Sequence, residues 1–120
     1  MLLLTTQDKS TMIILDRLSA VVDLELAKDY NTNRSTVTRY TLGLKVLTAK
    51  HEFIVCKKTI DKDSPEINMF KDQLKQLKAD IVEAYRTYRD NLTINNFNDE
   101  YYYIDYNFKL QKVNTTKETL

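Results

Sequence analysis

The hydrophobic residues of this chain recur mostly at intervals of three and four, the spacing that places side chains on one face of an α-helix. Leu18, Val22 and Leu26 follow this spacing between residues 16 and 30. A second series starts near residue 34 and continues to about residue 58. The two series predict two amphipathic helices separated by a polar turn.

The most regular series follows Ser64-Pro65-Glu66, where a capping serine and a proline at the first helical position are typical of a helix start. The pattern predicts a helix over residues 65–92 with one narrow apolar stripe. Such a stripe suits pairing between helices of two chains, so we expect an oligomerisation helix. The alternative is packing within one chain against the two earlier helices. The stripe has seven members: Ile67, Phe70, Leu74, Leu77, Ile81, Ala84 and Tyr88.

Period-two alternation, the signal of a β-strand, is confined to short segments. It is clearest in residues 101–110, YYYIDYNFKL, which are also rich in aromatic residues. Residues 9–15, KSTMIIL, are β-branched and apolar and predict a second strand. Residues 1–7 fit a short strand or a frayed end, and residues 52–58 fit either a strand or the end of the second helix.

The composition favours helices over a many-stranded sheet. The 120 residues are 42% hydrophobic and 29% charged, and they include one glycine and one proline, too few for many tight turns. We therefore predict a mainly α fold with a small β component. The predicted organisation is a head over residues 1–60, an oligomerisation helix over 61–96 and a C-terminal strand and tail over 97–120.

Charge is unevenly distributed although the net charge is only +1. Residues 31–60 carry six lysine or arginine residues against one glutamate, a net charge of +5, whereas residues 61–120 carry nine basic and eleven acidic residues. A basic segment joined to an acidic half is typical of a nucleic-acid-binding head with a differently used tail.

The chain offers little chemistry for catalysis. It has one histidine, one cysteine and one glycine, so paired metal ligands, a disulfide framework and a glycine-rich phosphate loop are all missing from the sequence. We expect a non-enzymatic protein without a catalytic site, metal or cofactor. The start lacks the features of a signal peptide and no apolar run is long enough to span a membrane, which predicts a cytoplasmic location.

Residues 23–40, DLELAKDYNTNRSTVTRY, match the core of a helix-turn-helix, with residues 52–58 as the strand of a wing. In that arrangement the first turn of the second helix enters the major groove. The predicted base-contacting residues would then be Arg34, Ser35, Thr36, Thr38 and Arg39.

A ribbon-helix-helix is the alternative that we favour for the head. Residues 9–15 would pair with a second chain in an antiparallel ribbon that lies in the major groove, with Lys9, Ser10 and Thr11 as its polar residues. The start of the second helix, near Arg34, would hold a phosphate. Gly43 costs about 1 kcal/mol relative to alanine inside a helix, and a close contact between chains would explain its presence.

The segment YTLGLKVLTAK, residues 40–50, resembles the second helix of ribbon-helix-helix DNA-binding proteins, and more narrowly the relaxosome accessory proteins of the TraM type. The resemblance covers about residues 11–50. It implies an N-terminal ribbon-helix-helix joined to a helical tetramerisation region. It also implies a C-terminal segment that contacts a coupling protein.

These observations favour an oligomeric, sequence-specific double-stranded DNA-binding protein that acts as a relaxosome accessory factor or a small transcriptional regulator. The oligomer would be a dimer or a tetramer. The residues expected to contact phosphates are Arg34, Arg39, Lys45 and Lys50. The alternative is a non-enzymatic interaction module, such as a virion component, an inhibitor of a host complex or an antitoxin. That module would bind its partner through the aromatic segment within residues 97–120.

Overall fold

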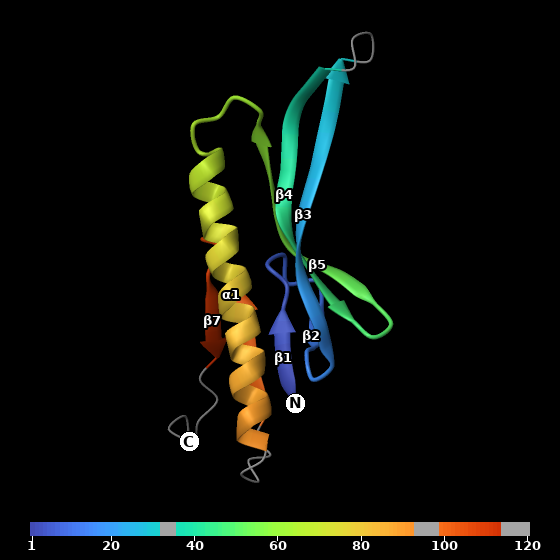
Figure 1. Ribbon diagram of the computed structural model, residues 1–120, viewed down its shortest axis with the longest axis vertical. Coiled ribbons are helices and arrows are strands. Elements are labelled where there is room, and N and C mark those ends of the chain that lie inside the picture. The colour runs from blue at the N-terminus through green and yellow to red at the C-terminus, as the bar shows by residue number, and fades with distance from the viewer. Residues whose placement is uncertain (32–35, 93–98, 114–120) are drawn as a thin grey trace.

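The computed structural model describes residues 1–31, 36–92 and 99–113, except for the side chains of residues 28–31 and 36–38. The described residues are mostly β-strand and include a single helix (Figure 1). In chain order the elements are β1 (Leu2–Thr5), β2 (Met12–Ile14), β3 (Leu18–Asn31), β4 (Thr36–Thr48), β5 (Glu52–Asp61), α1 (Ile67–Leu92), β6 (Glu100–Ile104) and β7 (Leu110–Val113).

This architecture corrects the prediction of a mainly α fold with a ribbon-helix-helix head, and it equally overturns the winged helix-turn-helix alternative. Both segments predicted as helices of the head are long strands, β3 and β4. The spacing of Leu18, Val22 and Leu26 is even, so it also satisfies the two-residue period of a strand. In β4 the repeated threonine, valine and tyrosine residues favour the extended conformation, because these side chains pack well on a pleated surface.

The scarcity of glycine did not prevent a sheet, because aspartates and left-handed residues form two of the described turns. In the β1–β2 turn, Asp8 accepts hydrogen bonds from the backbone N–H and the hydroxyl of Ser10, and Lys9 has a φ of 64°. In the β6–β7 turn, Asp105 accepts a backbone hydrogen bond from Asn107, and Phe108 has a φ of 59°. Aspartate side chains commonly close such turns by bonding to the backbone two residues on.

The strands form two sheets. The four-stranded sheet has the order β2-β1-β6-β7, in which β1 and β6 are parallel and the other pairs antiparallel. The three-stranded sheet is the antiparallel meander β3-β4-β5. A backbone hydrogen bond from Gln7 to the carbonyl of Val55 connects the two sheets. Val55 lies at an irregularity in the β4–β5 register, so this bulge directs a carbonyl toward the β1–β2 turn.

Helix α1 lies against both sheets and matches the helix predicted over residues 65–92 almost completely. Its start is capped by Ser64, whose hydroxyl accepts the backbone N–H of Glu66 at 3.2 Å. The predicted coiled coil is wrong, however, because the apolar stripe faces the sheets of its own chain. Phe70, Leu74, Leu77, Ile81 and Tyr88 are buried in the common core, and Ile67 and Ala84 are half-buried.

One hydrophobic core holds the molecule together. It contains residues from the first strand to β6, including Leu2, Leu44, Leu77 and Ile104. The inner face of each sheet and the apolar stripe of α1 all contribute to it. At the margin of this core, Lys71 and Lys78 of α1 form ion pairs with Glu25 and Asp23 of β3, at 4.0 Å and 3.7 Å respectively.

Gly43 does mark a close approach, but within the chain and not between two chains. It lies in β4 opposite Leu24 on one side and Lys57 on the other. A β-carbon at this position would overlap the backbone carbonyl of Cys56 and lie 2.9 Å from the Cα atom of Lys57. Glycine is therefore required because the β5 backbone occupies the space that a side chain would need.

Candidate interaction surface

The residues predicted to contact DNA are not presented together on one element. Lys9, Ser10 and Thr11 lie in the β1–β2 turn, whereas Arg39 and Lys45 lie on β4 in the other sheet. Thr36 and Thr38 are also in β4, but their side chains lie outside the description. Arg34 and Ser35 lie outside the described residues altogether. The recognition helix and the intermolecular ribbon that would have presented these residues to DNA are replaced by strands paired within the chain.

Several of these polar groups already have partners. Arg39 pairs with Asp61 at 3.2 Å and Lys45 with Glu52 at 3.3 Å. In the β1–β2 turn, hydrogen bonds lower the pKa of Asp8 to about 2. The largest contribution comes from the Ser10 hydroxyl, and smaller ones come from the Ser10 N–H and the Thr6 hydroxyl. Ser10 therefore serves the geometry of the turn. DNA binding therefore stays a prediction.

The aromatic C-terminal segment is also placed differently from the expectation. Residues 101–110 do not form one strand, because β6 ends at Ile104 and a turn precedes β7. β6 is hydrogen-bonded to β1 on one side and to β7 on the other. Its backbone is thus already paired and is not free to extend the sheet of a partner. Residues 97, 98 and 114–120 lie outside the described residues.

The four-stranded sheet has an inner and an outer face, which the register assigns. Leu2 and Leu4 of β1 are fully buried in the core, so Leu3 and Thr5 point to the opposite side. Strand pairing places alternate residues of β2, β6 and β7 on that same side. We call this set the outer face: Leu3, Thr5, Met12, Ile14, Tyr101, Tyr103, Gln111 and Val113.

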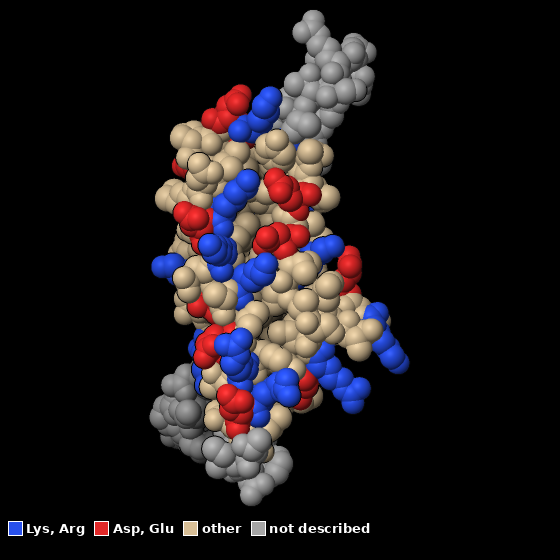
Figure 2. Space-filling model, viewed as in Figure 1, with Lys and Arg blue, Asp and Glu red and all other residues tan. Residues whose placement is uncertain are grey.

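The outer face carries no charged side chain among its eight strand positions, six of which are apolar or aromatic. Met12 and Ile14 are 56% and 53% exposed. Leu3 is only 7% exposed, although it is outside the central core, because neighbouring side chains on the same face shield it. By contrast, lysine, arginine and acidic side chains are mixed over α1 and β3 on the side shown in Figure 2. An uncharged patch on a chain with 29% charged residues is typical of an interaction surface.

A groove of about 610 Å³ borders the outer face beside β2. One wall is β2 itself and the start of β1, and the other is the tip of the β4–β5 hairpin. Apolar side chains form its floor, and Arg17, Lys50 and His51 stand at its margin, each exposed. Lysine and arginine side chains project in Figure 2 where Figure 1 places that hairpin.

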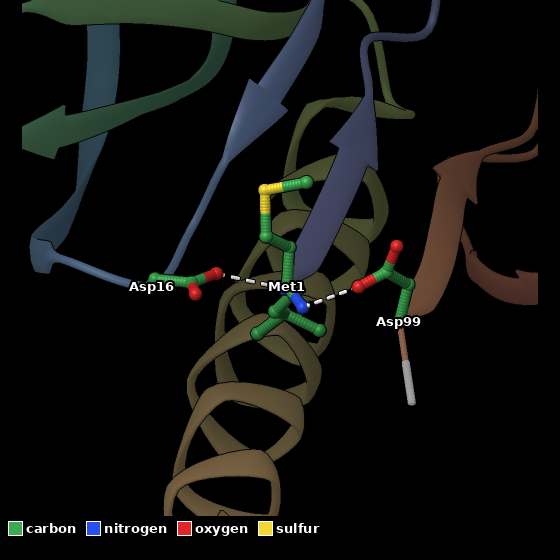
Figure 3. Close-up of polar contacts among 4 residues, drawn as sticks. Met1, Asp16 and Asp99 are labelled. Carbon is green, nitrogen blue, oxygen red and sulfur yellow. Dashed lines mark hydrogen bonds and ion pairs between the residues drawn. The ribbon is translucent and has the colours of Figure 1, made fainter. Parts of the chain in front are cut away.

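Two aspartates fix the end of the groove at the start of β1 (Figure 3). Asp16 accepts the backbone N–H of Leu2 at 2.7 Å, and Asp99 accepts a hydrogen bond from the amino group of Met1 at 2.6 Å. The Met1–Asp99 pair is largely exposed, so it contributes little stability. Asp16 lines the groove, but one of its oxygen atoms is already used to hold the β1 backbone.

Other parts of the described chain offer less for a ligand. A second groove of about 410 Å³ between α1 and β3 is lined by Asp23, Glu25, Lys71 and Lys78, whose charges pair with one another. Cys56 is buried, and burial raises the pKa of its thiol to about 11. No group of three histidine, cysteine or acidic side chains able to hold a metal occurs within residues 1–31, 36–92 and 99–113.

Sequence reasoning missed the outer face, although two signals were present. Residues 12–15, MIIL, are more apolar than a DNA-reading ribbon usually is. Residues 101–104, YYYI, are aromatic or apolar at every position, so neither face of that strand is polar. Each signal marks a strand with two apolar faces. Only the pairing of β1 with β6 brings the two segments side by side.

Comparison with protein-family models, curated protein sequences and solved structures gives no match for this chain. Within the part of the chain that the structure describes, no helix has both the length and the apolar character needed to cross a membrane.

Proposed function

We propose that this protein is a non-enzymatic interaction module that works as a homodimer, with the outer face as the dimer interface. The observation that carries the proposal is the absence of any charged side chain among the eight strand positions of a half-exposed, apolar and aromatic face. Tyrosine and methionine are enriched at interfaces, and tyrosine buries a large area at a small entropic cost.

The lack of charge favours a second copy of this chain as the occupant. In a twofold interface the same patch serves both partners, so a charged residue near the axis would face its own copy. Like charges placed opposite one another weaken an interface by several kcal/mol. The eight positions of the outer face avoid that penalty, and a charge beside them, the carboxylate of Asp105, accepts a hydrogen bond from the Gln111 side chain at 2.9 Å.

The size of the face sets the expected strength of the dimer. Four strands at about 4.8 Å spacing form a face about 19 Å wide, and its short strands make it a small patch. Stable complexes usually bury about 800 Å² on each partner. We therefore expect a reversible dimer whose population depends on protein concentration.

The test is the mass in solution, measured by sedimentation across a hundredfold concentration range. The expected result is a shift from the mass of one chain toward that of two. Tyr103→Lys, which places a charge in the centre of the face, should abolish the shift while circular dichroism remains unchanged. Ile54→Lys introduces the same charge at a similarly exposed apolar residue of the three-stranded sheet and serves as the matched control.

The proposal is wrong if the wild-type chain stays monomeric throughout the range. It is also wrong if Ile54→Lys and Tyr103→Lys affect association equally, since the outer face would then not be the interface. A dimer that survives Tyr103→Lys would likewise assign association to another surface.

A further inference from the structure

We infer that the groove beside β2 binds an extended, acidic peptide segment of a partner protein, which pairs with the free edge of β2. This inference goes beyond the proposed dimer and does not depend on it. Its basis is the edge of β2, the apolar floor of the groove and two cations at its margin.

The backbone of β2 is available for pairing on the groove side. The N–H of Leu15 bonds to the carbonyl of Leu2, and the carbonyl of Thr11 accepts the N–H of Thr6, so these odd-numbered positions face β1. Alternate residues of a strand direct their backbone groups to opposite edges. The N–H and C=O groups of Met12 and Ile14 therefore point away from β1, at the outer edge of the sheet.

The β2 edge lacks the protection that the other sheet edges have. Strand β3 carries Asp23 and Glu25, which pair with lysines of α1, and its register contains bulges. The β5 edge contains the bulge at Val55, and β7 carries Lys112, which pairs with Glu100 at 3.2 Å. Natural proteins usually blunt exposed strand edges with charges and bulges, because an open edge recruits other strands. Strand β2 is limited as an edge only by its length of three residues; it carries neither charges nor bulges and presents two exposed apolar side chains.

Charge complementarity defines the chemistry of the segment. Arg17 and Lys50 stand at the groove margin, and among the described residues neither has an ion-pair partner. The nearby carboxylate of Asp16 already accepts a hydrogen bond from Leu2. A partner that supplies carboxylates at the margin and an apolar side chain over Phe53 satisfies both features. Addition of a strand to a sheet edge is a common mode of peptide recognition, in which pockets for alternate side chains give specificity.

The test uses the full chain and two fluorescent synthetic peptides, one of alternating valine and glutamate and the other of alternating valine and lysine. Fluorescence anisotropy should show that the glutamate peptide binds at least tenfold more tightly. The double variant Arg17→Glu with Lys50→Glu should reverse this preference. The matched control Lys57→Glu with Lys62→Glu makes the same change in net charge at exposed positions outside the groove and should leave the preference within twofold.

A glutamate peptide with methylated alternate amides should bind at least tenfold more weakly, because it cannot pair with the β2 backbone. Repeating the titration with Tyr103→Lys separates this inference from the proposed dimer, since the groove should bind the peptide in the monomeric variant as well. Equal affinity for the two peptides would overturn the inference. Equal effects of the two double variants would overturn it too, because the attraction would then be nonspecific.

Discussion

The four-stranded and three-stranded sheets each bury one face in the common core and leave one face open, but the open faces differ in charge. The open face of the three-stranded sheet carries the ion pairs Arg39–Asp61 and Lys45–Glu52. It also carries a hydrogen bond between the hydroxyls of Thr41 and Thr59 at 3.0 Å. The outer face of the four-stranded sheet has no charged residue at its strand positions.

This difference shows that exposure alone does not identify an interaction surface. A sheet face with paired charges remains compatible with water, because the charged groups are hydrated and keep other apolar surfaces away. An uncharged apolar face gains free energy when another surface covers it. Each open face also has one shielded leucine, Leu3 on the four-stranded sheet and Leu24 on the three-stranded sheet. Both are 7% exposed and lie outside the central core, so substitutions at the two positions can be compared directly.

The largest effect is expected at Gly43, on the open face of the three-stranded sheet. Gly43→Ala should lower the free energy of unfolding by about 3 kcal/mol, because the new methyl group collides with the β5 backbone and the strands must shift. Urea denaturation measures the change. Ser19→Ala, at an exposed position of β3, is the control and should change stability by less than about 0.5 kcal/mol. Equal stability of wild type and Gly43→Ala would show that β4 and β5 are not packed this closely.

The second prediction compares the two matched leucines. At low protein concentration Leu3→Ala and Leu24→Ala should each cost about 2 kcal/mol, the lower end for truncating a shielded leucine, because neither side chain lies in the central core. At high concentration the cost of Leu3→Ala should increase, because the outer face is then covered by a second copy and stability depends on association. The cost of Leu24→Ala should stay constant. Thermal unfolding at several concentrations measures both, and a parallel response of the two variants would remove the distinction between the faces.

The smallest effect is expected in the β1–β2 turn, which supports the outer face beside Met12. The folded-state pKa of Asp8 is about 2, below its ordinary value of 3.8, so the ionised carboxylate stabilises the folded state at pH values above 3.8. This contribution is lost as the pH falls from 3.8 through about 2. Asp8→Asn should therefore lower the melting temperature slightly at neutral pH and lose its effect near pH 2. Asp63→Asn, in the exposed β5–α1 loop, is the control. A difference that persists unchanged at pH 2 would contradict the role of ionised Asp8 in the turn.

Helix α1 shows which part of the fold the sequence pattern could predict. Its start after Ser64-Pro65 and its apolar stripe follow from capping chemistry and from a long, regular repeat, and both are local properties. The partner of the stripe is not local. A helix with one apolar face is stabilised by a second chain or by a sheet of its own chain equally well, so the pattern alone could not exclude the coiled coil.

Strands β3 and β4 show why the remainder of the prediction failed. Apolar residues four positions apart lie on one side of a helix and also on one side of a strand, so Leu18, Val22 and Leu26 could not distinguish the two. β-branched and aromatic residues favoured the strand, but the low glycine content favoured helices. Two of the described turns, β1–β2 and β6–β7, use aspartate side chains and the left-handed residues Lys9 and Phe108 in place of glycine, which composition does not reveal.

The sequence by itself determined the long helix, the short strand character near residues 12–14 and 101–104, and the uneven charge. It determined these because each depends on residues close together in the chain. Tertiary structure alone decided that β1 pairs with β6 across about a hundred residues, that the helix stripe packs against two sheets, and that eight uncharged residues from four strands share one face. Those features depend on which distant segments pair, and the hydrogen-bonding groups that pair strands are the same at every residue of the backbone.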